Sequence, residues 1–252
     1  MEDRVAIVTG GASGIGRATA LELAKSGLRV VISDVNDEAG NAVVESLRAD
    51  GRDAIFVHTD VSRTQDVEHL IASTIDTFGR LDMACNNAGF DGPIGRLLDQ
   101  TEDALSQVLA VNVHGTFNCM RAEIAHMLTA GGGAIVNIAS VAGLVGMPKM
   151  SLYSAAKHAV VGLTRTAAIE YAAKNISINA VCPGGIETPM LQRLSDHVDP
   201  ARTQGENLAR AHPAKRLGRP EEVAAVIAFY LMGRSGFSTG AVVPVDGGYS
   251  AG

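Results

Sequence analysis

The sequence contains no tryptophan, only three cysteines and no long uninterrupted apolar stretch. The cysteines, Cys85, Cys119 and Cys182, are odd in number and form no Cys-x-x-Cys pair, so a disulfide framework is not expected. The longest apolar run, Val223–Met232, has about half the length that a membrane-spanning helix needs. The seven histidines show no ligand spacing, so no metal site is expected. The cysteine usage fits a reducing compartment, and we expect a cytoplasmic protein.

Charge of either sign is also sparse. Charged residues make up 19% of the 252 residues, and 21 Lys and Arg against 27 Asp and Glu give a net charge of −6. Without a basic run, neither nucleic acid nor an anionic membrane is an expected partner. The acidic start Met1-Glu2-Asp3-Arg4 does not resemble a signal peptide. The 46% hydrophobic content supplies one large core, and we expect a single domain over residues 1–252.

Short apolar, β-branched runs alternate with longer helical patterns along the whole chain. Because these runs are apolar throughout instead of alternating, they predict strands buried on both faces. The fold class is therefore α/β, with a seven-stranded, mostly parallel sheet and helices on both faces. Two long helices are expected near Glu102–Thr129 and Met150–Ala173, and Glu187–Ala211 reads as a substrate loop or lid. The expected strands are Val5–Thr9, Arg29–Ser33, Ala54–His58, Leu81–Cys85, Ala134–Ala139, Ser177–Val181 and Ala241–Val245.

A glycine-rich loop follows the first expected strand and precedes a helix. It reads Thr9-Gly10-Gly11-Ala12-Ser13-Gly14-Ile15-Gly16. Gly10 allows a tight turn, Gly14 a close approach to a pyrophosphate, and Gly16 close packing of the helix on the sheet. A pyrophosphate would meet the positive end of that helix. Glycine-rich turns also simply connect strands to helices, but the position at the start of a βαβ unit favours a dinucleotide site.

Asp34 ends the second expected strand, where a carboxylate can hydrogen-bond both hydroxyl groups of an adenosine ribose. The same charge would repel a 2′-phosphate, by roughly 4 kcal/mol at about 4 Å and an effective dielectric constant near 20. This favours NAD over NADP. Two alternatives remain: Asp34 can be an ordinary turn residue, and Arg17 can neutralise a phosphate, although a solvated helix position suits it better.

A second group of residues is suited to proton transfer. Tyr153 and Lys157 share one face of the second long helix, about 6 Å apart along its axis. A neighbouring cation makes a phenol easier to ionise, so Tyr153 could exchange a proton with an alcohol or a ketone. Such a pair alone is most often surface packing, but Ser140 follows the fifth strand, where α/β sheets bind ligands. Asn112 lies mid-helix, and a buried amide there could hold a water that relays protons from Lys157.

Taken in order, these motifs resemble the short-chain dehydrogenase/reductase family over essentially the whole chain. The resemblance implies a single Rossmann-like domain with strand order 3-2-1-4-5-6-7, and homotetramers in many members. Its G-x-x-x-G-x-G loop differs from that of longer relatives acting on nucleotide sugars, so simple carbonyl and alcohol redox is expected. The motifs are Thr9–Gly16, Asp60-Val61, Asn86-Asn87-Ala88-Gly89, Asn112, Ser140, Tyr153 with Lys157, Pro183-Gly184 with Thr188, and Asp246-Gly247-Gly248.

The resemblance also implies a role for each residue. Tyr153 would be the general acid/base, Ser140 would orient the substrate oxygen, and Asn112 would bind the relay water. Lys157 would bind the nicotinamide ribose and lower the pKa of Tyr153. The expected cofactor contacts are Gly10, Ser13, Gly14, Ile15, Gly16, Asp34, Val35, Asp60, Val61, Asn87, Ala88, Gly89, Tyr153, Lys157, Pro183, Gly184, Ile186 and Thr188, with NAD as cofactor.

Three segments are expected to shape the substrate pocket: Phe90–Arg96, Val141–Leu152 and Glu187–Ala211. Their apolar members predict an adaptable lining with little fixed charge, suited to a hydrophobic, possibly cyclic secondary alcohol or ketone. Two alternatives stay open: an NADPH-dependent 3-oxoacyl-thioester reductase, and a catalytically silent NAD(H)-binding regulatory protein. The apolar members are Phe90, Ile94, Leu144, Val145, Met147, Met150, Met190 and Leu191.

Overall fold

A computed structural model of the chain describes residues 3–192, 209–233 and 236–252. Seven parallel strands form one sheet in the order β3-β2-β1-β4-β5-β6-β7, as the family resemblance implied. The strands are β1 (Val5–Thr9), β2 (Arg29–Asp34), β3 (Ala54–His58), β4 (Met83–Asn86), β5 (Gly133–Ile138), β6 (Ile176–Pro183) and β7 (Val242–Val245). The helices are α1 (Gly14–Lys25), α2 (Asp37–Ala49), α3 (Thr64–Phe78), α4 (Glu102–Leu109), α5 (Gly115–Ala130), α6 (Ser151–Tyr171) and α9 (Pro220–Leu231).

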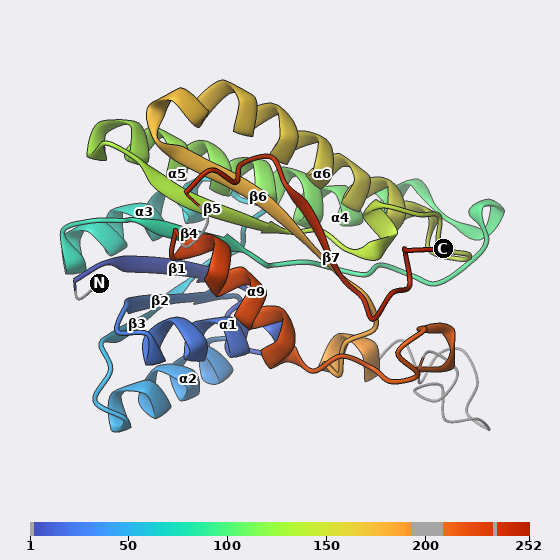
Figure 1. The fold of residues 1–252 in the computed structure, drawn as a ribbon, viewed down its shortest axis with the longest axis horizontal. Coiled ribbons are helices and arrows are strands. Elements are labelled where there is room, and N and C mark those ends of the chain that lie inside the picture. Colours follow the sequence, from blue (N-terminus) through green and yellow to red (C-terminus); the bar gives the residue numbers. More distant parts are fainter. Residues whose placement is uncertain (1–2, 193–208, 234–235) are drawn as a thin grey trace.

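The strands form where the sequence predicted them, with shifts of at most two residues at their ends. Burial explains their composition, because every residue of β1 and β4 is buried. Helices cover both faces of the sheet (Figure 1), with α1, α2 and α9 on one face and α3 to α6 on the other. Two apolar clusters fill these layers. One is centred on Leu23, Ile32 and Ile227, and the other on Leu70 and Met127.

The strand register aligns the carboxyl ends of the central strands at one edge of the sheet. Thr9 at the end of β1 lies level with Ser33 of β2 and with Asn86 of β4. Asn137 of β5 lies level with Asn86 in turn. The loops that leave these strands therefore start side by side, which is where open α/β sheets bind their ligands.

The first long helix is interrupted. The expected helix Glu102–Thr129 consists of α4, a π-helical turn at Ala110–His114, and α5. The fully buried Asn112 donates from Nδ2 to the Val108 carbonyl oxygen at 2.9 Å, and Thr116 Oγ1 donates to the Asn112 carbonyl at 2.8 Å. Side-chain bonds of this kind compete with the backbone ladder of the helix, which accounts for the wider turn.

The expected substrate loop Glu187–Ala211 falls largely on residues 193–208, which lie outside the described residues. Residues 187–192 and 209–211 are described, and members of both segments, among them Thr188 and Ala211, line the same cavity. Among the described residues, no helix has the length and apolar content to cross a bilayer. The same residues contain no cluster of three or more His, Cys, Asp or Glu side chains that could hold a metal ion.

Candidate active site

A cavity of about 760 Å³ lies at the carboxyl ends of the strands. Of the residues expected to bind the cofactor or to carry the proton chemistry, all but Gly16 and Asn112 line it. Those residues come from the glycine-rich loop, the ends of β2 to β6 and the first turns of α6. The folded chain therefore brings the two groups of motifs, the phosphate loop and the proton-transfer residues, into one continuous site.

The glycine-rich loop passes close to its neighbours. Gly10 and Gly14 have positive φ angles of 62° and 51°, and a side-chain carbon on Gly16 would lie 2.1 Å from the Gly10 carbonyl oxygen. Gly16 therefore does not line the cavity, and its lack of a side chain lets the start of α1 pack closely against Gly10. Within the described chain, Ser13 makes no side-chain cap at the start of α1, and the first turn has no acidic residue. Its N–H groups and positive end therefore remain available to an anion.

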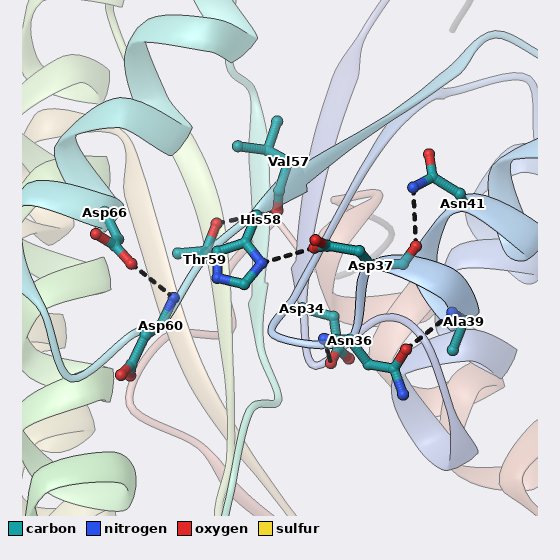
Figure 2. A network of polar contacts seen from close by, with 10 residues as sticks. All are labelled: Asp34, Asn36, Asp37, Ala39, Asn41, Val57, His58, Thr59, Asp60 and Asp66. Atoms are coloured by element: carbon teal, nitrogen blue, oxygen red, sulfur yellow. Dashed lines mark hydrogen bonds and ion pairs between the residues drawn. The ribbon is translucent and has the colours of Figure 1, made fainter.

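The carboxylates at the ends of β2 and β3 accept hydrogen bonds from the loops around them, and Figure 2 shows one of these bonds, from the Asn36 N–H to Asp34. Asp34 accepts hydrogen bonds from the N–H groups of Ala12 and Asn36, both at 3.1 Å. Asp60 accepts from the Ser62 N–H at 2.9 Å and from its hydroxyl at 2.7 Å. We call this part of the cavity, lined by Asp34, Val35, Asp60 and Val61, the β2–β3 end.

Ser140, Tyr153 and Lys157 meet near the middle of the cavity. Ser140 leaves β5, and its Oγ accepts a hydrogen bond from the Ala142 N–H at 3.1 Å. The ammonium group of Lys157 donates to the Ile138 carbonyl at 2.9 Å and lies 5.5 Å from the centre of the Tyr153 ring. The first turns of α6 and the end of β5 therefore fix all three side chains.

The pKa of Tyr153 moves in the direction opposite to the one expected. Burial raises it to about 12, while a side-chain hydrogen bond with Ser140 acts to lower it. Burial also lowers the pKa of Lys157 to about 8. The sequence analysis considered only the neighbouring cation, and the cost of desolvating a phenolate outweighs it. Tyr153 is accordingly a protonated phenol near neutral pH.

Asn112 does not line the cavity but supports its wall from behind. Its Nδ2 donates to the Phe90 carbonyl at 2.7 Å, and its Oδ1 accepts from the Phe90 N–H at 3.3 Å. A side-chain carbon on Gly89 would lie 3.2 Å from Asn112 Oδ1 and 3.5 Å from Lys157 Nζ. Asn112 therefore fixes the turn after β4 and stands across a narrow space from the Lys157 ammonium group.

The loops after β4, β5 and β6 enclose the other end of the cavity, which we call the loop end. Six of the expected apolar residues line it, but Leu144 and Val145 do not, and Leu144 instead packs against a buried cluster of Ala139, Val160, Val161 and Cys182. The lining also carries more fixed charge than expected, because Asp91 and Lys149, which belong to the named loops, line the cavity. The sequence analysis missed these two, together with His212 and Tyr249. The lining residues at this end include Phe90, Asp91, Ile94, Met147, Lys149, Met150, Met190, Leu191, His212 and Tyr249.

His212 and Tyr249 reach the cavity from segments remote in sequence. His212 is buried, and its Nε2 accepts a hydrogen bond from the Gly185 N–H at 3.0 Å. Its ring centre lies 5.3 Å from that of Tyr249, whose hydroxyl lies 3.6 Å from Met147 Sδ. Asp246 holds this C-terminal turn by accepting bonds from Gly248 and Ser250. No spacing in the sequence connects these residues with the catalytic group.

A buried polar network lies beneath the turn after β4. Asn86 Nδ2 donates to Glu123 Oε2 and to Asn137 Oδ1, both at 3.0 Å, and Asn137 Nδ2 donates to Thr164 Oγ1 at 2.9 Å. Glu123 is 1% exposed, and desolvation raises the pKa of its carboxyl to about 7. The network joins β4, β5, α5 and α6 immediately behind the residues that carry the proton chemistry.

Comparisons with known proteins agree with this site. A family model described as enoyl-(acyl carrier protein) reductase matches residues 10–250. The chain is 42% identical to cyclohexanol dehydrogenase of Acinetobacter sp. (strain SE19) over 249 residues, covering 99% of this chain and 96% of that one. The crystal structure of levodione reductase superposes with a TM-score of 0.95 at 39% identity, covering 100% and 99% of the two chains.

A second solved structure, ElxO with NADP bound, has a TM-score of 0.92 and 36% identity, with complete coverage of both chains. The likeness therefore extends over the entire fold and includes a protein that binds a nicotinamide cofactor. The strand order of the sheet agrees with these full-length matches. The chain belongs to the short-chain dehydrogenase/reductase family.

Proposed function

We propose that this protein is an NAD-dependent oxidoreductase that interconverts a secondary alcohol and a ketone on an apolar ring. The observation that carries the proposal is the placement of Ser140, Tyr153 and Lys157 in the same cavity as the uncapped start of α1. A proton donor and an anion-binding helix end are the two parts that hydride transfer to a carbonyl requires of the protein.

The residues of the β2–β3 end and the glycine-rich loop fit a nicotinamide dinucleotide. The N–H groups at the start of α1 would bind its pyrophosphate, and Asp34 would bind the adenosine ribose with Val35, Asp60 and Val61 around the adenine. Asn87, Ala88 and Gly89 would line the strand ends, and Pro183, Gly184, Ile186 and Thr188 would hold the nicotinamide. When bound, the cofactor supplies or accepts the hydride.

The proton travels through side chains of this chain. In ketone reduction, Ser140 would hold the carbonyl oxygen by a hydrogen bond while Tyr153 donates its phenolic proton to it. The raised pKa of Tyr153 keeps that proton in place near neutral pH. In alcohol oxidation the tyrosinate would accept the hydroxyl proton instead. Lys157 and a water held near Asn112 would return protons to Tyr153 through the space beside Gly89.

The lining of the loop end favours a ring substrate. Phe90, Ile94, Met150 and Met190 offer apolar and adaptable surface beside the catalytic group. The names of two relatives, cyclohexanol dehydrogenase and levodione reductase, agree with a cyclic alcohol or ketone.

The alternative is an NADPH-dependent 3-oxoacyl-thioester reductase, which would use the same catalytic residues. The NADP bound by ElxO and the description of the family model favour it. The Asp34 carboxylate, held toward the cavity by two N–H groups, disfavours a 2′-phosphate. A catalytically silent NAD(H)-binding protein would have no need for the complete set of Ser140, Tyr153 and Lys157.

The test is oxidation of NADH and NADPH, followed at 340 nm, with cyclic, linear and aryl ketones and 3-oxoacyl thioesters. NADH-dependent reduction of cyclic ketones with a kcat/KM above that of NADPH supports the proposal. Thioester reduction with NADPH would establish the alternative, and NADH binding without turnover of any compound would establish the silent binding protein.

We also infer that the protein assembles as a homotetramer. Large apolar side chains are exposed on α4, α5 and α6, and these are Leu105, Phe117, Leu128 and Ile169. Phe229 and Phe237 are exposed near β7, where Phe237 has no cover from the described chain. Exposed apolar surface in two places suits two kinds of subunit contact. Light scattering coupled to size exclusion should give four times the 26.1 kDa chain mass, and a monomer would contradict the inference.

A further inference from the structure

Among the described residues, Asp91 stands out from the other carboxylates of the cavity because it lacks a partner. Three carboxylates from the described part of the chain line the cavity: Asp34, Asp60 and Asp91. Asp34 accepts hydrogen bonds from the glycine-rich loop and from its own turn, and Asp60 accepts two from Ser62. Asp91 makes no hydrogen bond or ion pair with any part of the chain that the structure describes, and neither Lys149 nor Lys157 pairs with it.

The backbone around Asp91 is fixed on both sides. Both backbone polar groups of Phe90 are bonded to the Asn112 side chain. Gly92 adopts φ 69°, and a side-chain carbon there would lie 2.4 Å from Val108 Cγ2, which is completely buried. Farther along, Gly95 donates to the Lys149 carbonyl at 3.0 Å. A carboxylate is therefore held at the cavity wall by a rigid turn, without any internal bond that would explain its presence.

The position of Asp91 is close to the reacting group. Its charge acts on Tyr153, where it contributes to the raised pKa of the phenol. That effect opposes ionisation of Tyr153, so the carboxylate does not assist the proton transfer itself. The remaining wall of the loop end is mostly apolar, which leaves the Asp91 oxygens as acceptors within reach of a ligand. A partly exposed acceptor at the cavity wall, without a partner in the described chain, favours a ligand that brings a donor.

We propose that Asp91 is a specificity-determining residue that accepts a hydrogen bond from a second hydroxyl group of the substrate. The preferred substrate class is then a cyclic diol or hydroxyketone, whose first oxygen lies at Tyr153 and Ser140. This inference rests on the proposed function, because it assumes that a ring alcohol reacts at Tyr153. Anionic ring substrates are disfavoured by the same carboxylate.

Three alcohols distinguish this role from a structural one: cyclohexanol, the isomers of cyclohexanediol, and 4-hydroxycyclohexanecarboxylate. We expect Asp91→Asn to lower kcat/KM for the best diol isomer roughly 10-fold, because the charged acceptor is replaced by a weaker neutral one. Turnover of cyclohexanol should change much less than that of the diol, because cyclohexanol has no second hydroxyl group and only the effect of the Asp91 charge on Tyr153 is lost. The anionic alcohol should gain several-fold, because a like charge is removed.

The control is Glu68→Gln, which removes one exposed carboxylate from α3, away from the cavity. Glu68→Gln should leave kcat/KM for all three alcohols unchanged. Turnover of cyclohexanol by the Asp91→Asn protein shows that the Asp91→Asn protein is folded. If the ratio of diol to cyclohexanol turnover is the same in wild type and Asp91→Asn, the inference is overturned while the proposed function stands. If the wild type oxidises none of the alcohols with NAD, the proposed function fails and this inference with it.

Discussion

At the β2–β3 end of the cavity both carboxylates accept hydrogen bonds from neighbouring loops, whereas at the loop end Asp91 has no partner in the part of the chain that the structure describes. The walls differ in the same way, because strand ends beside the glycine-rich loop form the first, and methionines from two loops form much of the second. The first end is preorganised for one ligand of fixed shape. The second end presents flexible methionine side chains, so its apolar wall can adapt to the substrate.

The largest effect is expected from Tyr153, which lies where the two ends of the cavity meet. Tyr153→Phe removes the proton that both reaction directions need, and should lower kcat roughly 10²-fold to 10⁴-fold. NADH affinity, measured by fluorescence titration, should change little because the ring remains. Tyr171→Phe, at the far end of α6, is the matched control and should leave kcat unchanged. If Tyr153→Phe kept nearly full activity, Tyr153 would not be the general acid/base.

The β2–β3 end should respond to a loss of charge with a change of cofactor. Asp34→Asn keeps an oxygen that can accept from Ala12 but removes the repulsion of a 2′-phosphate. We expect the ratio of kcat/KM for NADPH over NADH to rise roughly 10-fold to 100-fold. Glu38→Gln removes an exposed charge from the first turn of α2, outside the cavity, and should not change the ratio. An unchanged ratio in Asp34→Asn would show that cofactor choice is made elsewhere.

Small changes of size should have unequal effects at the two ends. Gly14→Ala adds one carbon at φ 51°, 3.2 Å from Thr188 Cγ2. The left-handed backbone costs about 1–2 kcal/mol for a residue with a side chain, so KM for NADH should rise several-fold. Met147→Leu changes the shape of the loop end at similar volume and should alter KM for a cyclic ketone less than about threefold. A larger effect of Met147→Leu would indicate that the loop end is the more rigid part.

The same contrast explains what the sequence could predict. Strand positions and order were predictable because buried parallel strands are apolar throughout and the motifs follow a fixed succession. The β2–β3 end was predictable because each of its residues directly follows a strand or belongs to the glycine-rich loop. The break between α4 and α5 was not predicted, because it depends on where the Asn112 amide bonds in three dimensions.

The loop end was predicted less well. His212 and Tyr249 arrive from the far C-terminal part of the chain, and only the tertiary fold brings them beside Met147. Asp91 lies in a loop that was identified, but its significance depends on the absence of a bond partner in the described chain. The pKa of Tyr153 was predicted in the wrong direction, because sequence spacing shows the neighbouring Lys157 and does not show burial.

The buried carboxyl of Glu123 couples folding to proton uptake. Its pKa is about 7 in the folded protein and near 4.5 when exposed, so near pH 6 folding draws a proton from the buffer. Glu123 should therefore contribute about 3 kcal/mol to the free energy of unfolding at low pH, and this contribution should be lost as the pH rises from 4.5 through 7. Glu123→Gln keeps an acceptor for Asn86 and should raise the melting temperature at pH 8 but not at pH 4.5.

Calorimetry at pH 6 in buffers of different ionisation enthalpy measures the proton directly. Wild type should release a fraction of one proton on unfolding that Glu123→Gln does not release, and equal values would show that Glu123 is ionised in the fold. A core that takes up a proton as it closes makes this protein's stability a function of the acidity around it, through a residue that no substrate touches.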